Sequence, residues 1–122
     1  MYKAKDLNGN WVKGYLYETQ NESFITPKTK ENHPTETKWV KVLPYTTCKA
    51  SNLRDKAGEV IYENDFYDIG DRYYVFFQNG AFTGGKTAEA TTTLGWESEV
   101  EDEELFECDF CKTILITGNK FD

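Results

Sequence analysis

Short runs of apolar residues, separated by turn residues, recur along the whole chain. Residues 11–17 alternate roughly between apolar and polar positions, as a half-buried strand does. Pro, Gly and Asn end most of the runs, which is typical of antiparallel strands joined by tight turns. Strands are predicted at residues 11–17, 23–26, 38–43, 59–62, 66–69, 72–78, 81–83, 87–94 and 112–117.

This spacing predicts a mainly β fold with about eight strands and at most one or two short helices. Frequent turns between short strands indicate a small barrel-like or orthogonal antiparallel β domain. Residues 72–78 are almost continuously apolar, which predicts a strand buried on both faces. We expect residues 27–37 to form an exposed loop, the segment up to Asn52 to be irregular, and residues 97–107 to form a short acidic helix.

Composition agrees with one small β-rich domain. The chain has 122 residues, of which 16% are aromatic, and residues 1–122 are expected to form a single domain. No run of 18 apolar residues exists, and no apolar segment follows the lysines at the start, so neither a membrane span nor a signal peptide is predicted. We therefore expect a cytoplasmic protein with reduced thiols.

Charge is divided unevenly along the chain. Residues 1–50 carry 8 Lys and 5 acids, whereas residues 51–122 carry 6 Lys or Arg and 16 acids. The net charge of −7 disfavours direct binding of nucleic acid, although a local basic patch in the first half stays possible. The acidic stretch 97–109 is a solvated surface, a docking face for a basic protein partner, or a mimic of a phosphate backbone. Its candidate partner-binding residues are Glu97, Glu99, Glu101, Asp102, Glu103, Glu104 and Glu107.

Turn chemistry is densest between residues 51 and 66. Asp55 and Gly58 are suited to closing one tight turn, with Gly58 taking a positive φ. Asn64 suits a second turn, since Asn tolerates a left-handed backbone. Two interpretations follow. The run is a folding device with Leu53 and Ile61 among its core residues, or Asp55, Tyr62 and Asp65 converge on a partner site.

The same run resembles the signature of the YopX-like proteins of phages and prophages. That family shows a pattern close to Thr-Gly-Leu-x-Asp-x-x-Gly-x-x-Ile-Tyr-Glu-Gly-Asp, preceded by Pro-x-Thr. The signature residues are Leu53, Asp55, Gly58, Ile61, Tyr62, Glu63 and Asp65. Pro44, Thr46 and Ser51 extend the match, and Asn52 and Asn64 replace two glycines of the pattern. Residues 11–14 and 116–119 resemble the family's first strand and its closing element.

The resemblance implies a mainly β, barrel-like fold and a phage or prophage setting in a bacterial host. It implies no catalytic residue, because the family is functionally uncharacterised. We therefore expect an accessory protein that is not an enzyme, needs no cofactor, and acts through a protein partner or self-association.

A nucleotide-binding alternative rests on residues 80–87, which match Gly, four residues, Gly-Lys-Thr. A phosphate loop needs a helix to begin at the Lys-Thr pair, so that its N-terminus faces the phosphates. Residues 88–95 are short, rich in threonine and interrupted by Gly95, so a hairpin turn followed by a glycine-rich loop is favoured.

Three cysteines and one histidine are the remaining candidates. Cys108 and Cys111 have half the spacing of a zinc ribbon, and only Cys48 and His33 remain as further ligands. The preceding acids disfavour a reactive thiolate, so ordinary reduced cysteines are the default. Tyr73, Tyr74, Phe76 and Phe77 are assigned to core packing rather than base stacking, because Arg72 is the only basic residue beside them.

Overall fold

The computed structural model describes residues 1–27, 38–78, 80–86, 92–96 and 110–122, with the backbone alone at residues 78 and 92–96. The chain divides into two compact units, Met1–Lys49 (unit 1) and Ala50–Asp122 (unit 2), and each is described by itself. Eleven antiparallel strands and two three-residue 3₁₀ turns make up the described secondary structure, so the mainly β fold is confirmed.

Unit 1 is a four-stranded antiparallel meander. Its strands, in the order β4-β3-β2-β1, are β1 (Tyr2–Lys5), β2 (Trp11–Glu18), β3 (Ser23–Pro27) and β4 (Val40–Val42). Strand β4 turns back toward β1, because Val42 bridges Asp6 and the Leu43 N–H donates to the Lys5 carbonyl at 2.8 Å. The described strands therefore curl in a barrel-like way without forming a closed barrel. A 3₁₀ turn, Pro44–Thr46, leads into β5.

The core of unit 1 is small. Ala4, Ile25 and Val42 are buried, and Val12 and Leu16 pack against them from β2. Gly14 occupies the same inward face of β2, where an added Cβ would lie 1.9 Å from the Thr26 carbonyl oxygen. The other face of β2 is therefore left to solvent.

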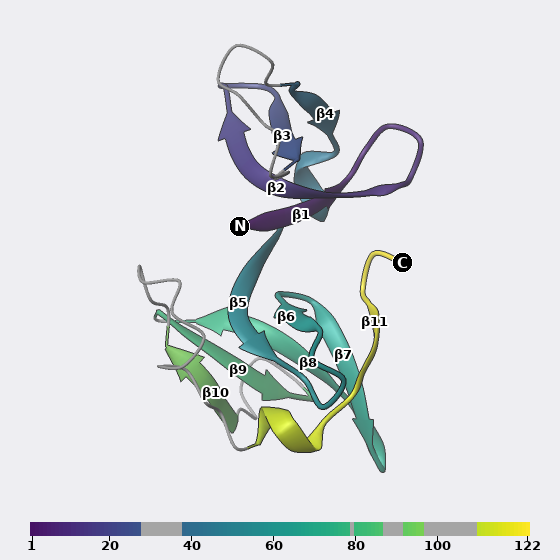
Figure 1. Cartoon of the computed structure of the whole chain (residues 1–122), viewed down its shortest axis with the longest axis vertical. Coiled ribbons are helices and arrows are strands. Elements are labelled where there is room, and N and C mark those ends of the chain that lie inside the picture. Colours follow the sequence, from purple (N-terminus) through teal and green to yellow (C-terminus); the bar gives the residue numbers. More distant parts are fainter. Residues whose placement is uncertain (28–37, 79, 87–91, 97–109) are drawn as a thin grey trace. The chain divides into compact units, whose positions relative to one another are not determined.

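Unit 2 holds most of the remaining strands (Figure 1). Strand β5 (Cys48–Arg54) starts beside β1 and continues beside β6 (Val60–Tyr62). The second sheet has the order β10-β9-β8-β7-β11, with β7 (Asp65–Ile69), β8 (Asp71–Gln78), β9 (Ala81–Gly85), β10 (Thr92–Trp96) and β11 (Ile116–Asn119). A 3₁₀ turn, Cys111–Thr113, precedes β11. The buried core consists of Leu53, Ile61, Tyr67, Val75, Phe82, Cys111 and Ile114.

Three expectations from the sequence are wrong. Residues 48–52 belong to β5 rather than to an irregular segment, and β1 was not anticipated, which brings the strands to eleven. Strand β8 is not buried on both faces: Val75 is buried, whereas Tyr74 and Phe76 on the other face are half-buried. The expected strand at 112–117 begins at Ile116, because the Thr113 hydroxyl donates to the Phe110 carbonyl and stabilises a 3₁₀ turn there.

No helix in the described part of the chain is long and apolar enough to cross a membrane. The expected acidic helix at 97–107 lies outside the described residues, as does the expected loop at 27–37 apart from Pro27, which is the last residue of β3. The assignment of residues 1–122 to a single YopX-like domain stays a prediction.

Candidate functional site

Asp55 is the anchor of the first signature turn. Its side chain is buried, and Oδ1 accepts backbone N–H groups from Ala57 at 2.9 Å and Glu59 at 3.0 Å. Oδ2 accepts the Ile116 N–H at 3.0 Å, across 61 positions of sequence. Both oxygens are therefore occupied by backbone donors, and this carboxylate holds the start of β11 against the 55–59 turn.

Two asparagines and a glycine supply the left-handed backbone of the signature. Asn52 has φ 63°, Asn64 has φ 68° and Gly58 has φ 81°. Asn is the residue that most readily replaces Gly in this region, since its short polar side chain tolerates the conformation. The expectation that Asn52 and Asn64 preserve a glycine-like backbone is confirmed.

Asp65 closes the second turn and ties it to the end of the chain. Its side chain is 2% exposed; Oδ2 accepts the Tyr62 N–H at 2.7 Å and Oδ1 accepts Asn119 Nδ2 at 2.8 Å. Burial, reinforced by the Asp65 charge, raises the pKa of the Tyr62 phenol above its ordinary value of 10.0. Leu53 and Ile61 lie in the core of unit 2. These contacts support the interpretation of the signature as a folding device.

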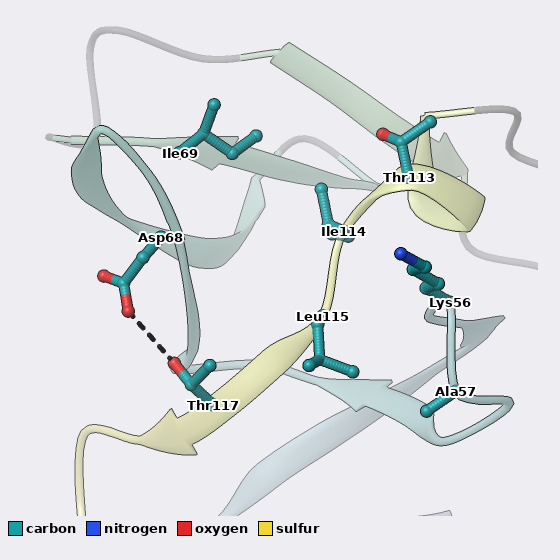
Figure 2. Close-up of a pocket in the computed structure, with 8 residues that line it drawn as sticks. All are labelled: Lys56, Ala57, Asp68, Ile69, Thr113, Ile114, Leu115 and Thr117. Atoms are coloured by element: carbon teal, nitrogen blue, oxygen red, sulfur yellow. Dashed lines mark hydrogen bonds between the residues drawn. The ribbon is translucent and has the colours of Figure 1, made fainter.

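A groove of about 480 Å³ lies on unit 2, where the first signature turn meets the segment that leads into β11. We call it the unit 2 groove. Its lining residues are Lys56, Ala57, Asp68, Ile69, Thr113, Ile114, Leu115 and Thr117 (Figure 2). A backbone hydrogen bond of 2.8 Å from the Lys56 N–H to the Ile114 carbonyl joins its two sides.

The described lining of this groove is partly aliphatic and partly polar. Ile69 and Leu115 are each 51% exposed and offer aliphatic surface at its margin. Asp68 accepts hydrogen bonds from Thr117 Oγ1 at 3.3 Å, drawn in Figure 2, and from Arg72 Nε at 3.2 Å. The groove thus combines half-exposed aliphatic groups with hydrogen-bonded polar groups and with the side chain of Lys56.

The glycine-rich stretch is part of a sheet. Residues 81–85 form β9, which pairs with β8 on one side and β10 on the other, and all five are buried. Their backbone N–H groups face neighbouring strands instead of an anion. Lys86 forms an ion pair with Asp71, and the hydrogen bond from that carboxylate raises the pKa of the lysine. The described residues of this motif therefore do not form a phosphate loop.

The remaining candidates are the cysteines, His33 and the acidic residues. Cys48 and Cys111 are buried, and among the described residues no group of three or more His, Cys, Asp or Glu is placed to hold a metal ion. Cys108 and His33 lie outside the described residues. The same holds for the predicted partner-binding acids Glu97, Glu99, Glu101, Asp102, Glu103, Glu104 and Glu107.

An aromatic cluster in unit 1 is the feature that sequence reasoning missed. Tyr17, Phe24 and Trp39 line a pocket of about 420 Å³, and the Tyr17 and Trp39 side chains are 54% and 50% exposed. In contrast, Tyr73 and Phe77 of β8 pack against the core of unit 2, as expected. The alternation of aromatic residues along 11–17 was the signal in the sequence, because it places Tyr15 and Tyr17 on one face of a strand.

Comparisons with models of protein families, with curated proteins and with solved structures find no match to this chain. The likeness to the YopX-like proteins therefore rests on the signature residues themselves.

Proposed function

We propose that this protein is a non-enzymatic accessory protein of phage or prophage origin. It acts in the cytoplasm of a bacterial host by binding a protein partner or a second copy of itself. The phage setting comes from the YopX-like resemblance alone. The binding mode is supported by the unit 2 groove, where half-exposed Ile69 and Leu115 share the lining with Asp68 and Thr117, which are hydrogen-bonded to each other.

The observation that carries the proposal is that unit 2 buries its signature carboxylates and exposes apolar side chains beside them. The signature carboxylates Asp55 and Asp65 are buried and accept hydrogen bonds from the unit's own backbone and from Asn119. The apolar surface beside the first turn is exposed instead. Exposed aliphatic side chains in a concave surface are a common feature of protein-binding sites. The signature thus builds the scaffold, and the groove is the surface available for a partner.

The acidic residues between Glu97 and Glu107 are a second contact region for the same partner, on the ground of their charge. Eight acids and no basic residue in positions 97–109 would attract a basic protein surface. Mimicry of a nucleic-acid backbone is one form of that interaction and stays a proposal.

Affinity capture from host lysate with matched variants tests the groove. Leu115→Asp places a charge at the half-exposed edge of the groove, whereas Leu7→Asp does the same at a 63% exposed position in unit 1. We expect a discrete set of proteins, or additional copies of the chain, to be retained by the wild type and by Leu7→Asp and lost from Leu115→Asp. Equal recovery of the same proteins by both variants would show that the groove is not the binding surface.

A further inference from the structure

One face of the unit 1 sheet carries aromatic and lysine side chains in alternation. Strand pairing places Lys3 opposite Lys13 and Lys5 opposite Trp11, and it places Tyr17 opposite Phe24 and Phe24 opposite Lys41. Residues directly opposite each other in neighbouring strands, and residues two apart in one strand, share a face of the sheet. We call the shared surface the aromatic–lysine face, and it consists of Lys3, Lys5, Trp11, Lys13, Tyr15, Tyr17, Phe24 and Lys41, with Trp39 packed against Tyr17.

The rings of this face are presented to solvent. Tyr15, Tyr17 and Trp39 are 49%, 54% and 50% exposed, although large aromatic side chains usually bury most of their surface in the core. The Tyr17 and Trp39 ring centroids lie 5.4 Å apart with the rings tilted by 52°, and Phe24 lies 6.5 Å from Tyr17. The three rings line the pocket of about 420 Å³, which is large enough for a planar group to stack against an exposed ring.

The charge of this face is positive. Its four lysines include Lys41, which forms an ion pair of 3.6 Å with Glu22. Lys3 Nζ and Lys5 Nζ lie 4.5 Å and 4.8 Å from the centre of the Trp11 ring, so these cations are held beside the aromatic surface. The described part of unit 1 carries six lysines against three Asp or Glu residues. The negative charge of the whole chain therefore conceals a basic surface in unit 1.

We propose that the aromatic–lysine face binds single-stranded nucleic acid. Unpaired bases stack on Tyr17 and Trp39, and the lysines of β1, β2 and β4 contact the phosphates. Single-strand binding surfaces combine these two elements, because every base has a stackable face and every nucleotide carries a negative charge. A proline-rich peptide would use the rings but gain nothing from the lysines, so charge complementarity favours the polynucleotide. This activity goes beyond the protein-binding function proposed above and differs from the expectation based on net charge.

Fluorescence anisotropy with the full chain tests the proposal. Labelled oligothymidylate, oligouridylate and a proline-rich peptide are titrated at about 50 and 200 mM salt, over which a phosphate-dependent complex weakens steeply. We expect both oligonucleotides to bind, and the relative affinities show whether DNA or RNA is preferred. Lys13→Gln is expected to lower the slope of log K against log salt by about 0.7, the value for one phosphate contact in a single strand. Lys112→Gln, at an exposed position in unit 2, is the charge control and leaves the slope unchanged.

The ring contacts are tested separately from the charges. Trp39→Leu and Tyr17→Leu keep apolar bulk but remove the stacking surface, and each is expected to weaken binding about fivefold or more. Tyr45→Leu alters a 70% exposed aromatic residue outside the face and leaves affinity unchanged. Circular dichroism melting curves identify any variant that loses its fold. The proposal is overturned if neither oligonucleotide binds at low salt, if the Tyr45 variant loses as much affinity as the Trp39 variant, or if only the peptide binds.

Discussion

Buried carboxylates are the feature that defines this chain at the scale of single residues. Asp55 and Asp65, which are 5% and 2% exposed, accept hydrogen bonds from backbone N–H groups of unit 2. A buried carboxylate is tolerated when its oxygens are satisfied in this way. The acidic residues Asp55 and Asp65 of the sequence signature therefore stabilise the fold, because their hydrogen bonds fix two turns and connect strands that are distant in sequence.

Asp55→Asn tests this role directly. The amide has only one oxygen, so at least one of the N–H groups of Ala57, Glu59 and Ile116 loses its acceptor, and we expect a loss of roughly 2 kcal/mol in the free energy of unfolding by urea. Asp6→Asn is the matched control, because Asp6 uses Oδ1 alone to accept the N–H groups of Asn8 and Asn10 in an exposed turn. That variant is expected to stay within about 0.5 kcal/mol of the wild type. Equal effects of the two changes would contradict the role given to Asp55.

The backbone at Asn64 gives a second prediction. With φ at 68°, an alanine there would suffer the left-handed penalty, and Asn64→Ala is expected to destabilise the protein by about 1–2 kcal/mol. Asn64→Gly is expected to cost less, since glycine adopts this conformation freely. Urea unfolding of both variants measures the difference. A glycine variant less stable than the alanine variant would contradict this explanation, since both variants lack the Asn64 side chain and only alanine carries the left-handed penalty.

Tyr62 links stability to pH. Its phenol has a raised pKa in the folded protein, so the folded state keeps this proton to higher pH than the unfolded chain does. The stability it contributes is present below pH 10, the ordinary pKa of tyrosine, and is lost as pH rises from there through the raised folded pKa. The melting temperature of the Tyr62→Phe variant is therefore expected to decline less steeply with pH in this range than that of the wild type. Thermal melts of the wild type, Tyr62→Phe and the exposed-site control Tyr45→Phe measure this dependence of the melting temperature on pH. If the control reduces the dependence as much as Tyr62→Phe does, Tyr62 is not its source.

At the scale of elements, unit 2 is held together by contacts between segments distant in sequence. Strand β11 pairs with β7, Ile116 donates to Asp55, and the Lys120 N–H donates to the Asn64 carbonyl at 2.8 Å. The signature run and the closing element, which resemble two separate parts of the YopX-like pattern, are therefore neighbours in space. Their spacing in the sequence is explained by a shared structural task.

Close packing between β9 and β7 gives a prediction at this scale. A Cβ on Gly84 would lie 2.0 Å from Tyr67 Oη, so Gly84→Ala is expected to cost about 1–3 kcal/mol through overpacking. Combining it with Tyr67→Phe removes the clashing oxygen and leaves the ring carbon Cζ at 3.0 Å as the nearest atom. We expect the double variant to be more stable than the sum of the single effects predicts. Strict additivity in urea unfolding would mean that the two residues do not meet.

Much of this element structure was predictable from local sequence. Strands β2, β3, β6, β7, β8 and β9 fall where alternation and turn residues place them, because those signals are local. The positive φ at Asn64 was predictable for the same reason, whereas that at Asn52 was expected from the glycine that it replaces in the YopX-like pattern. Strand β1 was not, since its Tyr-Lys-Ala-Lys sequence is short and half polar, and β5 was hidden by the small and polar residues Ser51 and Asn52.

The candidate sites depended on information that the sequence does not carry locally. The unit 2 groove joins Lys56 and Ala57 to residues 113–117, and that pairing exists only once Asp55 has bound Ile116. Trp39 reaches Tyr17 only through the pairing of β3 with β4. The glycine-rich motif at 80–87 was only partly predicted, because Gly84 and Gly85, which were expected in a loop, extend β9.

At the scale of the whole molecule, the two units differ in charge and in what they expose. Unit 1 presents aromatic rings and lysines, whereas unit 2 presents an aliphatic groove, and its sequence contains the acidic stretch 97–109. We expect a protein partner at the groove and a single-stranded nucleic acid at the aromatic–lysine face, two ligands that a single net charge of −7 would not suggest.

Site-specific photo-crosslinking in host cells is the most direct test of whether a protein partner binds the unit 2 groove. A photoreactive amino acid replaces Leu115 in one version of the chain and Leu7 in another, both at exposed positions of similar character. We expect the photoreactive residue at position 115 to crosslink to one discrete protein, either a partner or a second copy of the chain. We expect no crosslinked protein from position 7. The same crosslinked proteins from both positions, or none from position 115, would contradict a partner site at the groove.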